Sequence, residues 1–169
     1  MLYHAEGGAT SDLSPIDQET GLRTALDSIG TRNRVLALPP DFTRVHSQAG
    51  SLTEAIYRYY GERLSGVLPA IGTHAPMTNE QIDTMFPSIP NSLFRVHNWR
   101  DETVTLGRIE SQMIHELSEG RLNYDWPAQV NRVLADRSHD LVLSIGQVVP
   151  HEVIGMANFN KNIFVGTGG

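Results

Sequence analysis

Cysteine is absent from this sequence of 169 residues, and lysine occurs only once. Without cysteine there are no disulfide bonds and no cysteine-based metal sites, so a secreted, disulfide-stabilised scaffold is excluded. Lys161 is the single lysine, and the other 12 of the 13 basic residues are arginine. A lysine amine can lose its proton and form a covalent bond, which a guanidinium does not do. Lys161 is therefore a candidate for chemistry, although drift in an arginine-rich chain explains one surviving lysine equally well.

A large basic surface is also missing. The formal net charge is −6, which disfavours a nucleic-acid partner, because nucleic-acid binding needs a basic surface that displaces counterions. A small anionic ligand needs only one local positive pocket. No apolar run approaches the roughly 20 residues of a membrane span, and residues 1–6 lack the basic and apolar regions of a signal peptide. We therefore expect a cytoplasmic protein that has no membrane partner.

Three common signatures of enzyme sites are absent. The sequence contains no Gly-x-Gly-x-x-Gly fingerprint, no Walker A loop and no Gly-x-Ser-x-Gly elbow. The usual dinucleotide-binding, ATP-binding and serine-hydrolase interpretations therefore lack their motifs.

The pattern of apolar runs predicts an α/β fold. Buried strands are expected at 34–38, 65–72 and 141–145, and shorter strands at 94–97, 103–106 and 162–165. Helices are expected at 18–29, from capping boxes at Ser51 and Thr78, and at 128–134. Apolar strands separated by helices indicate a mostly parallel sheet flanked by helices, in a Rossmann-like three-layer arrangement. Residues 1–29 would form an arm and a short helix, and 30–169 the α/β domain.

Polar side chains follow three of the predicted strands. Asp41, Thr43 and Arg44 follow the first strand, His74 follows the second, and His151 follows the strand at 141–145. Because ligands bind outside the carboxyl ends of parallel strands, these side chains are expected to meet at one sheet edge. An arginine fork suits a carboxylate or a phosphate, and two histidines suit proton transfer.

Each of these groups also has an ordinary structural explanation. Asp41 and Arg44 can belong to a solvated turn, and a lone histidine is more often structural or exposed than catalytic. His74 and His151 would also suit zinc, but no third ligand stands at a typical spacing. His97 is a further candidate for such a ligand. Their convergence, rather than any single residue, favours a site.

The ordered set of motifs resembles the N-terminal domain of the nickel-pincer-nucleotide lactate racemase family. The set comprises Asp41-Phe-Thr-Arg44, Gly72-Thr-His74, and Ile145-Gly-Gln-Val-Val-Pro-His151 with Lys161 ten residues further on. Asn131-Arg-Val and Asp140, ahead of the strand at 141–145, also look like that family. The resemblance covers roughly residues 30–169.

The resemblance implies a racemase or epimerase of 2-hydroxy acids. Family members carry a pyridinium mononucleotide that grips nickel and is tethered to a lysine, which Lys161 matches. Two histidines that exchange the hydroxyl proton match His74 and His151, and an arginine that holds the substrate carboxylate matches Arg44. Asp41 and Thr43 would lie at the cofactor phosphate. The resemblance also implies a second domain that closes over the cofactor.

Two departures from the family pattern stand out. Where the family often has Ser-Gly-Gly before the lysine, this chain has Ala157-Asn-Phe-Asn160, which suggests a divergent subgroup with a substrate other than lactate. The nickel-binding histidine of the family would lie beyond residue 169, as would the second domain. We therefore expect this chain to be a fragment that is inactive alone.

Two other functions remain as alternatives. One is a non-catalytic α/β module that holds a phosphorylated ligand at residues 41–44. The other is a metal hydrolase that uses His74, His97 and His151, which requires the three imidazoles to converge. The sequence leaves the oligomeric state open.

Overall fold

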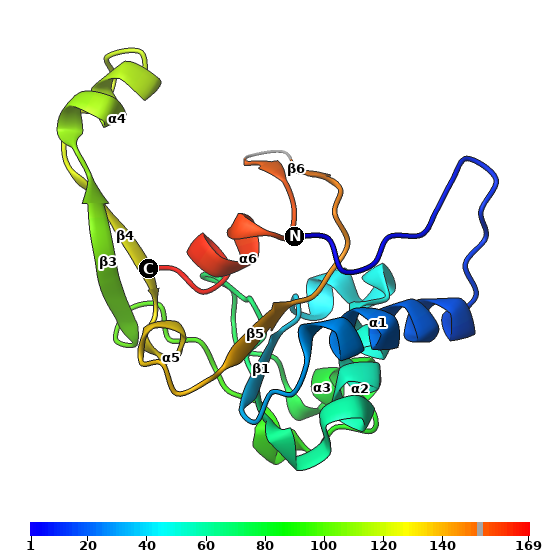
Figure 1. The fold of residues 1–169 in the computed structure, drawn as a ribbon. Helices are drawn as coiled ribbons and strands as arrows, with labels where there is room; N and C mark the ends of the chain where they lie inside the picture. The colour runs from blue at the N-terminus through cyan, green and yellow to red at the C-terminus, as the bar shows by residue number, and fades with distance from the viewer. Residues whose placement is uncertain (152–153) are drawn as a thin grey trace.

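The computed structural model describes residues 1–151 and 154–169 of the chain (Figure 1). Its elements in chain order are α1 (Pro15–Ile29), β1 (Val35–Leu38), η1 (Phe42–Ser47), α2 (Ala49–Tyr60), η2 (Gly61–Arg63), β2 (Leu64–Val67), α3 (Asn79–Met85), η3 (Asn91–Leu93), β3 (Thr103–Ile109), α4 (Ser111–Leu117), β4 (Trp126–Asn131), α5 (Arg132–Ala135), β5 (Leu141–Ser144), β6 (Pro150–His151), β7 (Gly155–Met156) and α6 (Asn160–Phe164).

Three parallel strands form the central sheet, in the order β2-β1-β5. β1 lies in the middle and pairs with both neighbours, Val35 standing opposite Leu64 on one side and Leu141 on the other. All four residues of β1 are buried, as expected for a central parallel strand. The predicted α/β class with a parallel sheet is therefore confirmed.

Helices cover both faces of this sheet. Successive side chains of β1 point to opposite faces, so each face presents apolar side chains for helices to cover. Val35 and Ala37 join the larger core cluster, to which α1, α2 and α3 contribute. Leu36 and Leu38 pack in a smaller cluster with residues of α5 and α6. Figure 1 shows α1, α2 and α3 together on one side of β1 and β5, with α6 on the other. The three-layer arrangement follows from this alternation.

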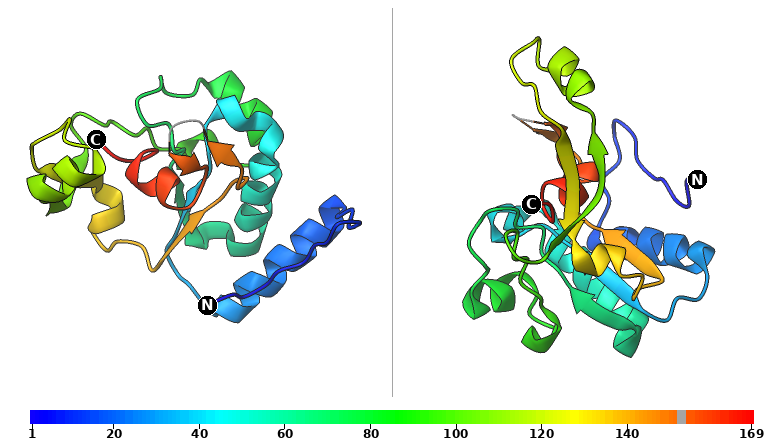
Figure 2. Two further views of the ribbon diagram at one scale, coloured as in Figure 1. Left: turned by 90° about the horizontal axis from the view of Figure 1, so that it is seen from above. Right: turned by 90° about the vertical axis from the view of Figure 1, so that its left-hand side faces the viewer.

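In the sequence between β2 and β5, the chain forms a long hairpin that extends away from the central sheet. Its antiparallel strands β3 and β4 carry α4 at the tip (Figures 1 and 2). The predicted helix at 128–134 is wrong over most of its length, since 126–131 is strand β4 and only Arg132–Ala135 is helical. Pairing with β3, in which Val130 stands opposite Val104, overrides the local helical spacing.

The helix N-termini show which of the predicted capping boxes form. The box at Thr78 is confirmed, with its hydroxyl accepting from the backbone of Gln81. The box predicted at Ser51 is wrong, because α2 already begins at Ala49 and the Ser51 hydroxyl donates to the Gln48 carbonyl. α1 begins at Pro15 rather than at residue 18, because Ser14 forms a capping box with Asp17 that the sequence analysis missed.

Strand lengths also differ from the predictions. The strand expected at 65–72 ends at Val67, and the one expected at 94–97 is reduced to a single parallel bridge between Phe94 and Val67. The strand at 141–145 is confirmed as β5, but it is an edge strand whose alternate residues are exposed rather than a buried one.

The predicted strand at 162–165 is instead helix α6. A helical turn puts the Asn162 side chain against the end of β5 and turns Ile163 towards the smaller core cluster. None of the helices in residues 1–151 and 154–169 is long and apolar enough to span a membrane.

The carboxylate of Asp140 ties the start of β5 to the start of β1. It accepts the backbone N–H of Asn33 at 2.8 Å and that of Arg34 at 2.9 Å. These two hydrogen bonds lower the pKa of Asp140 below its ordinary value. The charged form therefore stabilises the folded chain.

We expect Asp140→Asn to lower the midpoint of thermal unfolding at pH 7, because an amide offers only one acceptor oxygen to two donors. A lowered folded-state pKa stabilises fully above the unfolded value of about 3.9, and this contribution is lost as the pH falls through the folded-state pKa. The difference between the two proteins should therefore shrink in acid. Asp12→Asn, at an exposed aspartate, is the matched control, and equal midpoints at pH 7 would contradict the expectation.

Candidate functional site

A cleft of about 340 Å³ opens at the carboxyl edge of the central sheet. It is lined by Pro40, Asp41, Thr43, Arg44, Ala70, Ile71, Gly72, Thr73, His74, His151, Ile154, Lys161, Val165 and Gly166. We call it the polar cleft. All six residues that the sequence analysis selected are in its wall, although they come from four separate segments. Their chemical roles stay predictions.

Asp41 organises one side of the polar cleft. Its carboxylate caps η1 by accepting the backbone N–H of Thr43 at 3.1 Å, and it also accepts the Thr43 hydroxyl. The other carboxylate oxygen lies 2.6 Å from Nδ1 of His74. The Asp41 residue is only 6 % exposed, so its charge is held among these donors.

The contact with Asp41 sets the tautomer of His74. Because the carboxylate accepts at Nδ1, the neutral imidazole carries its proton there, and Nε2 becomes the acceptor nitrogen. The His74 side chain is 61 % exposed, so solvent or a ligand can reach it. A buried carboxylate behind an accessible imidazole is an arrangement suited to a general base.

Gly72 brings the His74 loop against the segment that follows α6. Its N–H donates to the Gly166 carbonyl at 2.8 Å, and its φ is +56°. A Cβ at this glycine would lie 3.1 Å from the Val165 carbonyl oxygen. The close approach of the two backbones joins the β2 end of the cleft to the helix that carries Lys161.

A network of polar side chains holds the start of α6, the helix that carries Lys161. Asn158 donates to the Gly146 carbonyl at 2.9 Å and accepts from Ser144 at 2.7 Å and from Asn162 at 2.8 Å. Asn162 is only 3 % exposed. The network fastens the start of α6 to the carboxyl end of β5, and so it fixes the backbone from which the Lys161 side chain extends.

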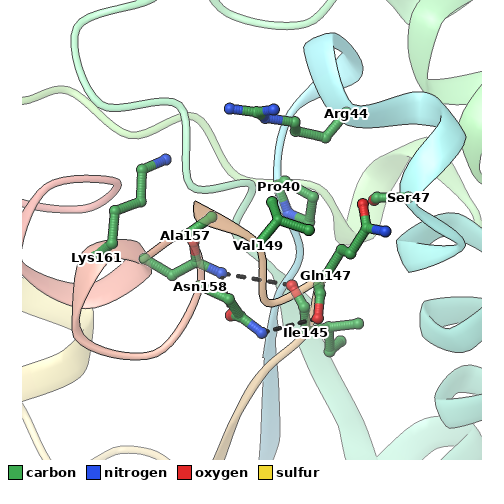
Figure 3. Close-up of a pocket in the computed structure, with 11 residues that line it drawn as sticks. Pro40, Arg44, Ser47, Ile145, Gln147, Val149, Ala157, Asn158 and Lys161 are labelled. Atoms are coloured by element: carbon green, nitrogen blue, oxygen red, sulfur yellow. Dashed lines mark hydrogen bonds between the residues drawn. The ribbon is translucent and has the colours of Figure 1, made fainter. Parts of the chain in front are cut away.

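A smaller pocket of about 30 Å³ adjoins the polar cleft, and its lining includes both Arg44 and Lys161. Figure 3 shows the two cationic side chains reaching towards this space from different elements, with Val149 and Gln147 beneath them. Since Arg44 and Lys161 also line the polar cleft, both cationic groups are available to a ligand bound there. An anionic ligand is therefore the kind that this region suits.

His97 lies outside the polar cleft, which contradicts the metal-hydrolase alternative. It is 2 % exposed, with Nε2 lying 2.8 Å from the Gly168 carbonyl oxygen and Nδ1 3.0 Å from the Asn131 amide. Both ring nitrogens are thus used to join the hairpin to the C-terminal segment. Among residues 1–151 and 154–169 there is no group of three or more histidine, aspartate or glutamate side chains that suits a metal ion.

Sequence reasoning missed the residues that hold the site together. Ser144, Asn158 and Asn162 did not match any motif, although asparagine recurs at 158, 160 and 162. Their function depends on the distance between β5 and α6, which the chain order does not reveal.

Solved structures of similar fold include the following two proteins. A Thermotoga maritima protein, solved as a structural genomics target, has a TM-score of 0.78 and 26 % sequence identity, and the match covers 91 % of this chain and 38 % of that one. Lactate racemase apoprotein from Thermoanaerobacterium thermosaccharolyticum has a TM-score of 0.64 and 20 % identity, covering 93 % of this chain and 37 % of that one. No protein-family model and no curated protein sequence matches.

These matches confirm, at the level of the fold, the resemblance that the motifs predicted. The chain spans less than two fifths of the length of either solved structure. At 20 % identity the likeness to lactate racemase shows a shared fold and carries no activity with it.

We expect His97→Ala to lower the free energy of unfolding by about 2–4 kcal/mol, because it opens a cavity and leaves the Asn131 amide and the Gly168 carbonyl without their partner. His74→Ala should cost no more than about 1 kcal/mol, since that side chain is largely exposed. Urea unfolding of both variants measures the difference. Equal losses would contradict the assignment of His97 to the fold and His74 to the site.

Proposed function

We propose that this chain is the cofactor-binding domain of a racemase or epimerase that acts on 2-hydroxy acids, with Lys161 as the tether of a nickel-pincer nucleotide. The observation that carries the proposal is the meeting of Asp41, Thr43, Arg44, His74, His151 and Lys161 around one cleft. The similarity in fold to lactate racemase supports it. The region that completes the enzyme would be a second domain of the same protein.

The side chains of the polar cleft fit the organic part of this cofactor. Lys161 offers the amine that a tether requires, and its backbone is fixed by the network around Asn158. Arg44 and the loop at Thr43 offer donors for a phosphate or a carboxylate. The resemblance to the family implies a nickel-binding histidine beyond residue 169, and the proposal keeps that assignment.

The bound cofactor would supply an acceptor for the hydride from C2 of the substrate. The residues of this chain would bind the substrate and move its hydroxyl proton. Arg44 would hold the carboxylate through paired N–H donors, which fixes the plane of the substrate. His74 would take the hydroxyl proton at Nε2, because Asp41 occupies Nδ1.

His151 would act on the opposite face of the substrate. One histidine would take the hydroxyl proton of one enantiomer. The mirror image would form when the hydride returns to the opposite face of C2 and the other histidine gives a proton to the oxygen. Asp41 would stabilise the protonated imidazole of His74 while the proton resides there. Proton transfer by a positioned histidine typically contributes about 10²–10⁴-fold to the rate.

The tether predicts a covalent adduct on Lys161. We expect the protein purified from a nickel-supplied host that makes the cofactor to show an intact-mass increase of nucleotide size. Peptide mapping should place the adduct on the peptide that contains Lys161. Lys161→Arg keeps the positive charge but removes the amine, so it should abolish the adduct.

An unmodified Lys161 in that host would contradict the tether. The module that binds a phosphorylated ligand would then be the better account of the polar cleft. Within residues 1–169 Lys161 is the single lysine, so a lysine adduct that maps to this part of the protein has one possible position.

The role of Arg44 predicts a selective loss of carboxylate binding. We expect Arg44→Ala to weaken the binding of lactate to the chain by about 10- to 100-fold, since a hydrogen bond to a charged group contributes about 1.5–3 kcal/mol. Arg44→Lys keeps the charge without the fork and should be intermediate. Titrations followed by NMR measure these affinities.

Arg100→Ala is the matched control for the arginine variants. Its guanidinium lies over the Trp99 ring, 3.8 Å from the centroid, and it does not line the polar cleft. If inorganic phosphate binds through Arg44 and lactate does not, the result would argue against the racemase and for the phosphate-binding module.

A further inference from the structure

The backbone just before α6 has an unusual conformation. Asn158 has a φ of +63° and Phe159 a φ of +46° with a ψ of −130°. Asparagine tolerates positive φ, and the hydrogen bonds of Asn158 to Gly146 and Ser144 account for its geometry. A bulky residue such as phenylalanine pays a conformational cost there that glycine would avoid.

Packing against the described part of the chain does little to offset the conformational cost at Phe159. The residue is 63 % exposed, so little of its apolar surface is removed from water by the described part of the chain. Strained residues of this kind concentrate at ligand-binding positions. A contact that forms when a ligand binds would account for the phenyl ring at this position.

Phe159 lies in the wall of an apolar hollow of about 420 Å³. Ile154, Met156, Phe164 and Val165 contribute to the same wall, and each of them is between 40 and 49 % exposed. Among the described residues that line the hollow, Lys161 is the only charged one. Contiguous exposed apolar side chains of this kind mark a binding surface.

The apolar hollow shares a wall with the polar cleft. Ile154, Lys161 and Val165 line both of them, so the two spaces lie next to each other. The polar cleft offers an arginine and two histidines to an acidic end, while the hollow offers aliphatic and aromatic surface. The shared wall thus favours a ligand that has a carboxylate at one end and an apolar group at the other.

We propose that Phe159 determines specificity, and that the substrate is a 2-hydroxy acid with an aromatic or branched aliphatic side chain, which binds in the apolar hollow. This inference rests on the proposed function, and it names the class of substrate. It also gives a physical reason for the phenylalanine next to the lysine-bearing helix, where a glycine would be less strained.

Lactate and 3-phenyllactate test this inference, because they share the carboxylate and the hydroxyl and differ only in the phenyl group. We expect 3-phenyllactate to bind the whole chain at least about tenfold more tightly than lactate, since burial of an aromatic group contributes about 1.5–3 kcal/mol. Phe159→Ala should bring the two affinities close together while the affinity for lactate stays unchanged. NMR titration measures all four values.

Phe159→Gly separates the effect on binding from the effect on folding. Relief of the strained backbone should raise the midpoint of thermal unfolding by about 2–4 °C, while the preference for 3-phenyllactate is lost. Met113→Ala, at an exposed methionine on the distant α4, is the control and should leave the preference unchanged.

The possible failures are distinguishable. Equal binding of the two acids to the parent chain, or an unchanged preference in Phe159→Ala, overturns the inference alone. Absence of binding by both acids overturns the proposed function together with it.

Discussion

Parallel pairing of β1 with β2 and β5 is the constraint on which the rest of the structure depends. Parallel strands end at the same edge of a sheet, so the loops that follow β1, β2 and β5 must lie side by side. Burial of all four β1 residues between two helical layers fixes that edge. The polar cleft forms because three loops and the helix α6 converge on it.

Two polar contacts convert this convergence into a defined site. The Asp41 carboxylate joins the loop after β1 to His74, at 2.6 Å, and the asparagines at 158 and 162 join α6 to the end of β5. Because both contacts cross between segments distant in sequence, the positions of His74 and Lys161 depend on the whole sheet being formed. Preorganisation of this kind lets a site orient a ligand without further ordering.

The polar cleft and the apolar hollow show a tension between stability and function. A glycine at position 159 would relieve the backbone, and fewer exposed apolar residues near α6 would lower the risk of aggregation. At the starts of α1 and α3, by contrast, the capping boxes at Ser14 and Thr78 are local signals that agree with the fold. Asn158 and Phe159 are two adjacent non-glycine residues with positive φ, and they directly precede the helix that carries Lys161.

The sequence by itself determined the α/β class, the three strands of the parallel sheet and the six residues around the polar cleft. These follow from apolar runs, strand ends and the order of motifs, all of which are local or nearly local. Only the tertiary structure decided that residues 126–131 form a strand, because that segment pairs with β3, and that 160–164 form a helix. It also decided that Asp41 contacts His74, that His97 belongs to the fold, and that Phe159 stands in a strained turn. Each of these depends on contacts between distant segments, which local periodicity does not encode.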